Sequence, residues 1–116
     1  MNELIHVVQG NPPIELHFWM FILTIKNFAT DEQIKKWISD ATHLWLHGCY
    51  AQTELGHGSN VGGLETTATF NEETDEIILN SPNIASYKFW PGELGIQATH
   101  AVIFAWLISK GKDHGI

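Results

Sequence analysis

The first third of the chain has the apolar spacing of helices. Residues 14–28 are apolar nearly all round, which is typical of a helix buried on most sides. The stretch "ATDEQIKKWI" then starts with a capping box, in which Thr30 is the N-cap and Gln33 the reciprocal N3 residue. The apolar residues that follow at i, i+3 and i+4 are Ile34, Trp37 and Ile38. The pattern predicts two helices, the second short and amphipathic.

After Asp40 the pattern changes to short apolar runs and alternation. Residues 64–70, "LETTATF", place successive side chains on opposite faces, as in a strand. A hairpin connection then leads to a second strand, "EIILN". Further strands are predicted at 44–52, 85–90 and 100–108, although periodicity alone does not exclude a helix for the last. The fold class is therefore α+β, with N-terminal helices followed by an antiparallel β unit, and both ends suggest a truncated domain.

The amino-acid composition disfavours some classes of binding partner. Hydrophobic residues make up 44% of the 116 residues, enough for a core, and the net charge is −7. The cations are six Lys with no Arg, so we expect neither nucleic acid nor an anionic membrane surface as a partner. The longest apolar runs are Phe18–Leu23 and Ala101–Ile108. Both are well short of the roughly 20 residues that a membrane-spanning helix needs.

A glycine-rich loop of small hydrogen-bonding side chains lies between two predicted strands. Its polar residues are Tyr50, Gln52, Thr53, Glu54, His57, Ser59 and Asn60. Long loops of this kind often bind ligands. The glycines match neither the dinucleotide fingerprint nor the P-loop, and Ser59 does not lie in a G-x-S-x-G elbow. The residues favour ligand binding over bond cleavage, with Glu54 expected to cap or brace the loop and His57 to orient it.

The spacing of the histidines, the cysteine and the acidic residues gives little support for a metal site or a reactive thiol. His43 and His47 are four residues apart, but no Cys or carboxylate stands around them at zinc-ligand spacing. The acidic stretch "NEETDE" lacks the ligand order of an EF-hand and is expected to be a solvated hairpin tip. Cys49 is the one cysteine and is expected to be a small buried apolar residue. We therefore predict no metal site.

Two motifs resemble those of the acyl-CoA oxidase family. They are "CYAQTELGHGSNVGGLETTAT" and, about twenty residues later, "KFWPGELG". The stretches "LHFWMF", "DEQIKKW" and "THAVIFAWLI" run in the order that this family shows, so the resemblance covers the chain from about Leu4 to Ile116. A weaker likeness to acyl-CoA dehydrogenases lies in T-E-x-G-x-G-S. The L-G-H-G and W-P-G elements favour the oxidases.

The resemblance implies a domain plan and a cofactor site. Residues 1–43 would be the end of an N-terminal α-helical domain, and residues 44–116 an incomplete middle β-barrel domain that binds flavin. Thr53 would hydrogen-bond the flavin ring of FAD, and Gly92 would approach it through its backbone. The other implied contacts are Tyr50, Gln52 and Trp90 with the flavin, and Ser59 near the thioester of the substrate. The family usually has Trp where Phe89 stands, so an aromatic residue is kept.

The resemblance also implies a reaction. Family members are FAD-dependent oxidases that convert fatty acyl-CoA to trans-2-enoyl-CoA in fatty acid β-oxidation and reduce dioxygen to hydrogen peroxide. A peroxisomal location is implied, with a homodimer for the full-length protein. The catalytic base is a Glu of the C-terminal helical domain, so this segment is expected to hold no catalytic residue and to be inactive alone. The alternatives are an acyl-CoA dehydrogenase and a non-catalytic β-domain that serves as a binding module.

Overall fold

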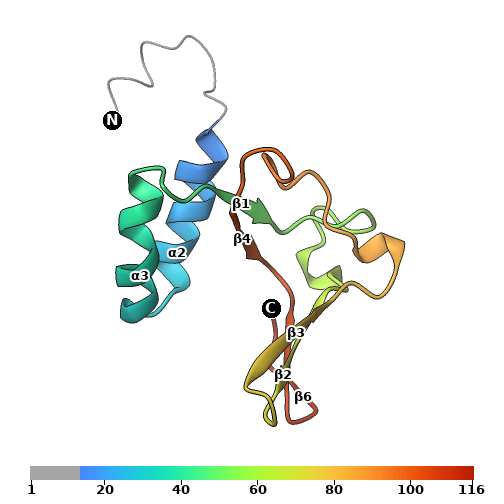
Figure 1. Ribbon diagram of the computed structural model, residues 1–116. Coiled ribbons are helices and arrows are strands. Elements are labelled where there is room, and N and C mark those ends of the chain that lie inside the picture. Colours follow the sequence, from blue (N-terminus) through green and yellow to red (C-terminus); the bar gives the residue numbers. More distant parts are fainter. Residues whose placement is uncertain (1–13) are drawn as a thin grey trace. The chain divides into compact units, whose positions relative to one another are not determined.

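The computed structural model describes residues 14–116, which form two compact units (Figure 1). The first unit extends to Tyr50 and adds the later segment Gly92–Val102. The second unit combines Ala51–Pro91 with Ile103–Ile116. The chain therefore passes between the units at 50–51, 91–92 and 102–103. The predicted boundary between residues 43 and 44 stays a prediction.

The first unit contains the two predicted helices. The π-helix η1 (His17–Ile22) continues directly into α2 (Leu23–Phe28), and α3 (Asp31–Thr42) lies beside α2 in Figure 1. The capping box is confirmed, because the Gln33 N–H donates to the Thr30 hydroxyl at 3.3 Å and the Thr30 N–H donates to the Gln33 side chain at 2.9 Å. None of the helices among residues 14–116 is long and apolar enough to cross a membrane.

The core of the first unit lies between these helices and the turn after α3. Its buried members are Phe21, Ile22, Ala41 and Leu46. Trp37 and Ile38, from the apolar face that the sequence predicts, pack against this cluster. The short strands β1 (Gly48–Ala51) and β4 (His100–Ile103) form a two-stranded sheet. Cys49 of β1 is buried as predicted, and burial raises the pKa of its thiol.

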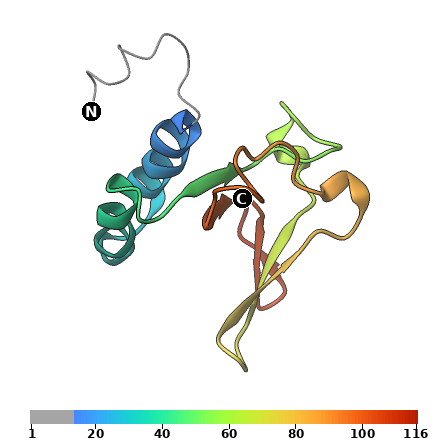
Figure 2. The same ribbon diagram turned by 45° about the horizontal axis from the view of Figure 1, so that its top comes forward.

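The second unit is built on a four-stranded sheet of order β3-β2-β5-β6. The strands are β2 (Thr67–Asn71), β3 (Glu76–Asn80), β5 (Trp106–Ser109) and β6 (Lys112–Asp113). The predicted hairpin is confirmed, since β2 and β3 pair antiparallel from Thr67↔Asn80 to Asn71↔Glu76. Figure 2 shows this hairpin beside the shorter β5–β6 hairpin.

Three details of the predicted β unit are wrong. The unit is not antiparallel throughout, because β2 and β5 pair in parallel. Residues 100–108 form two strands in separate sheets, because the chain changes pairing partner at Phe104 and Ala105. Residues 85–90 form no strand: they start within the 3₁₀-helix η3 (Ile84–Ser86), and the Asn83 side chain accepts backbone N–H groups that a strand would use. The described residues form no closed barrel.

Candidate functional site

Thr53 lies in a segment that runs beside residues 88–90 in the second unit. The Phe89 N–H donates to the Thr53 carbonyl at 2.9 Å, and Glu54 and Lys88 form an antiparallel bridge. Trp90 follows with 76% of its surface exposed and its ring stacked on that of Phe89. Thr53 is half-buried, and its hydroxyl makes no hydrogen bond to any residue within 14–116. Two of the predicted flavin contacts, Thr53 and Trp90, thus lie on neighbouring segments.

The carboxylate of Glu54 is the buried centre of this region, with 2% of the residue exposed. Oε2 accepts the N–H of Glu65 at 2.8 Å, and Oε1 accepts the N–H and the hydroxyl of Thr66 at 2.9 and 2.5 Å. These bonds join the start of the glycine loop to the residues that lead into β2. The expectation that Glu54 braces the loop is therefore confirmed.

Lys88 supplies the charge that balances Glu54. Its Nζ lies 3.1 Å from Glu54 Oε1, and the side chain is 12% exposed. Burial by itself would raise the pKa of Glu54, but hydrogen bonds from Thr66, from two backbone N–H groups and from Lys88 lower it to about 2. The Glu54 carboxylate is accordingly ionised at neutral pH.

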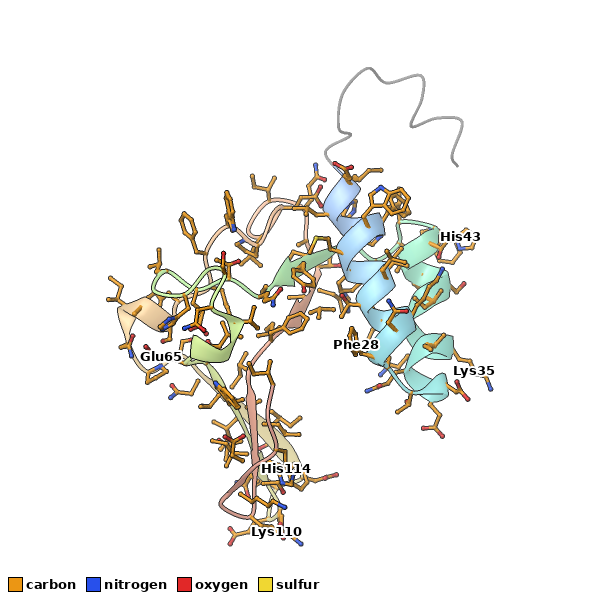
Figure 3. All side chains as sticks on the ribbon, turned by 180° about the vertical axis from the view of Figure 1, so that it is seen from behind. Phe28, Lys35, His43, Glu65, Lys110 and His114 are labelled. Atoms are coloured by element: carbon orange, nitrogen blue, oxygen red, sulfur yellow. The ribbon has the colours of Figure 1, made fainter. Side chains whose placement is uncertain are left out.

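The remainder of the glycine loop is closed by a second, more exposed contact. His57 Nε2 lies 2.9 Å from Glu65 Oε1, and Glu65 also accepts a hydrogen bond from the Asn83 side chain (Glu65 is labelled in Figure 3). Hydrogen bonds from Asn83 and His57 lower the pKa of the Glu65 carboxyl. A Cβ at Gly63 would meet the side chains of Asn60 and His57, which would have to shift to accommodate it. His57 thus connects the loop to Glu65, and its orienting role stays a prediction.

Gly92 belongs to the first unit and has a backbone that only glycine adopts readily. Its φ is +65°, and a Cβ built on it would overlap Cδ1 of Leu16. The flanking residues Trp90 and Glu93 also have positive φ, at 41° and 57°. Gly92 therefore lies in a stretch of the chain with unusual backbone dihedral angles.

The other predicted contacts are distributed between the units. Tyr50 is the last residue of the first unit and is half-buried, and burial raises the pKa of its phenol. Gln52 is half-buried and Ser59 is exposed, both in the second unit. Among residues 14–116 there is no group of three His, Cys, Asp or Glu residues placed to hold a metal ion.

Two features were missed by the sequence reasoning. The sequence pattern places Lys88 within a predicted strand and does not indicate its partner Glu54, which lies 34 residues away. An apolar groove of about 290 Å³ lies in the first unit, lined by Phe21, Trp37 and His100 among others. No predicted site residue lines this groove.

Comparison with known proteins identifies the family. The family model for the N-terminal part of acyl-coenzyme A oxidase matches residues 1–46. Peroxisomal acyl-coenzyme A oxidase 1 of Arabidopsis thaliana is 53% identical over 115 residues, which cover 99% of this chain and 17% of that protein. The chain belongs to the acyl-CoA oxidase family.

Solved structures of this family have the same fold as the chain. The acyl-CoA oxidase of tomato superposes with a TM-score of 0.92 at 53% identity, covering 98% of this chain and 17% of that one. Acyl-CoA oxidase-1 of Caenorhabditis elegans, solved in complex with FAD and ATP, gives a TM-score of 0.90 at 43% identity, covering 98% and 18%. The predicted α+β class is confirmed. The chain spans about a sixth of the length of the relatives it matches.

Proposed function

We propose that the chain forms part of an FAD-dependent acyl-CoA oxidase of fatty acid β-oxidation. The reaction would convert fatty acyl-CoA to trans-2-enoyl-CoA and reduce dioxygen to hydrogen peroxide. This proposal rests on one observation. The chain is 53% identical, over 99% of its length, to a peroxisomal acyl-CoA oxidase. The intact "TELGHGS" and "WPGELG" motifs support it. Peroxisomal location and a homodimeric full-length protein belong to the same proposal.

Two residues of the chain have features that suit contacts with a flavin. When bound, FAD takes the hydride from the substrate and passes the electrons to dioxygen. The Thr53 hydroxyl, which has no partner among residues 14–116, is available to donate to the flavin ring. Gly92 would approach the ring through its backbone, while the side chain of Leu16 fills the space that a Cβ would take. Donors fixed in place before the reaction stabilise charge that develops on the ring, and each is worth about 3 kcal/mol in the transition state.

The remaining contacts have supporting roles in this proposal. Trp90 would pack against the flavin with its exposed ring, and Tyr50 and Gln52 would contribute to the same wall. Ser59 would lie near the thioester of the fatty acyl-CoA. No residue of the chain is assigned as the catalytic base, so the chain binds and orients while proton removal falls to another part of the enzyme.

The test is made on the purified full-length protein. Its flavin absorbance is recorded first, and an acyl-CoA is then added in air while peroxide and flavin bleaching are followed together. The proposal requires peroxide release over many turnovers. Bleaching without peroxide would indicate a dehydrogenase, and a protein without flavin would leave only the binding module.

A further inference from the structure

We propose that the Lys88–Glu54 ion pair is a positioning device that fixes Thr53 for its contact with the flavin. The inference rests on the proposed function and adds to it a role for two residues that do not touch the cofactor. Neither residue is a catalytic residue in this account. Each acts through the backbone on which Thr53 is carried.

The ammonium group of Lys88 contacts the chain on both sides of Thr53. Its Nζ donates to the Gln52 carbonyl at 3.1 Å and to Glu54 Oε1 at 3.1 Å. A third contact reaches the Phe104 carbonyl at 2.7 Å. An ammonium has three hydrogens, and these three acceptors use all of them. The residues before and after Thr53 are thus held from a single point.

The backbone of Thr53 is also held directly. The Phe89 N–H donates to its carbonyl at 2.9 Å, next to the bridge between Glu54 and Lys88. In an extended segment neighbouring side chains point to opposite faces. Because the Glu54 side chain is fully buried toward Lys88, the Thr53 side chain is directed away from the pair. Two fixed backbone carbonyls, those of Gln52 and Thr53, and the anchored carboxylate of Glu54 therefore set the position of one hydroxyl.

A buried ion pair is not an efficient way to stabilise a fold. Replacing a buried ion pair by apolar residues of similar volume is often neutral for stability or even favourable. A lysine with three fixed acceptors does, however, define direction as well as distance, which apolar packing does not. Donors at a reacting ring are sensitive to placement, and a displacement of about 1 Å can lower the rate about 10²-fold. A positioning role therefore explains the ion pair better than a contribution to stability does.

The test is a double-mutant cycle on the full-length holoenzyme. The variants are Lys88→Met, Thr53→Val and the double variant, with Lys110→Met as the control. Lys110, which is labelled in Figure 3, forms a salt bridge with Glu72 at 3.6 Å in the same unit, but its side chain is 77% exposed. The measurements are kcat, the reduction potential of the bound flavin, and the unfolding midpoint of the protein freed of FAD.

We expect Thr53→Val to lower kcat about 10²-fold and Lys88→Met to lower it at least tenfold. Both variants should shift the reduction potential of the flavin in the same direction. In the Thr53→Val background, Lys88→Met should change kcat by no more than about twofold and leave the potential where it is. The loss of thermal stability caused by Lys88→Met should be equal in both backgrounds. Lys110→Met should change none of these quantities.

The inference is overturned if the kcat effects multiply, or if Lys88→Met leaves the flavin potential unchanged. Should Lys88→Met not fold, Lys88→Arg replaces it, because a planar guanidinium keeps the charge but cannot serve the same three acceptors. An unchanged kcat and potential in Lys88→Arg would then contradict the inference. Failure of the proposed function is a separate result, seen as wild-type protein without flavin or without peroxide.

Discussion

The imidazole of His17 accepts a hydrogen bond from the backbone N–H of Gly48 at 3.0 Å, which ties helix η1 to the first residue of β1. The other ring nitrogen, Nε2, lies 2.9 Å from the Ala41 carbonyl. Nδ1 therefore acts as the acceptor and Nε2 as the donor. Gly48 has no room for a Cβ, because the ring of Phe21 occupies that position. One buried side chain thus satisfies two backbone groups at the end of α3 and the start of β1.

Replacing His17 by Leu should destabilise the protein by about 1–3 kcal/mol, because the Gly48 N–H would be buried without a partner and the Ala41 carbonyl would lose the ring as a donor while keeping the N–H of Leu44. Chemical unfolding of the full-length protein measures the change. His43→Leu is the matched control, since His43 also contacts a helical carbonyl but is exposed. Equal stability of the two variants would show that the His17 bonds contribute nothing specific.

Gly92→Ala should both destabilise the protein and weaken FAD binding. The residue has φ +65°, which costs an alanine about 1 kcal/mol, and the new methyl group would overlap Leu16. Gly95→Ala separates these effects, because Gly95 has φ +83° with no atom near its Cβ position. We expect a larger loss of stability for Gly92→Ala, recovered in part by Leu16→Ala. Equal losses at both glycines would mean that the Leu16 contact has no effect.

Acid should lower the stability of the folded protein through protonation of Glu54. Its pKa is about 2 in the folded state against an ordinary value of 4.5, so the stabilisation is complete above pH 4.5 and is lost as the pH falls toward 2. A shift of this size corresponds to on the order of 3 kcal/mol. Glu54→Gln should lower stability at pH 7 and lose this part of the acid dependence. Glu73→Gln, in the exposed β2–β3 turn, serves as the control. A parallel pH dependence in wild type and Glu54→Gln would contradict the account.

Local signals in the sequence predict much of the fold. The capping box at Thr30 and the alternation that leads into the β2–β3 hairpin depend on neighbours within a few residues, and both are present in the structure. The split of residues 100–108 at Phe104 could not be predicted in this way. It depends on partners far along the chain, since the Trp106 N–H donates to the Thr66 carbonyl at 2.9 Å. Nothing in an apolar run marks where its pairing partner changes.

The sequence predicts only part of the candidate site. The bracing role of Glu54 is predicted from its place in "TELG", but the N–H groups that it binds belong to Glu65 and Thr66, further along the chain. Its partner Lys88 is 34 residues away, and only the structure pairs them. The flavin contacts of Thr53 and Gly92 came from resemblance to a family and not from local physics. They remain predictions.

The central claim is that the Thr53 hydroxyl stabilises charge on a bound flavin. The measurement that tests it most directly is the reduction potential of the flavin in full-length Thr53→Val, compared with wild type and with Thr69→Val. Thr69 is a half-buried threonine of β2 in the same unit, so its variant controls for loss of a hydroxyl. The account predicts a lower potential in Thr53→Val, because a donor to the reduced ring is lost, with wild-type behaviour in Thr69→Val. An unchanged potential in Thr53→Val with FAD still bound would contradict it.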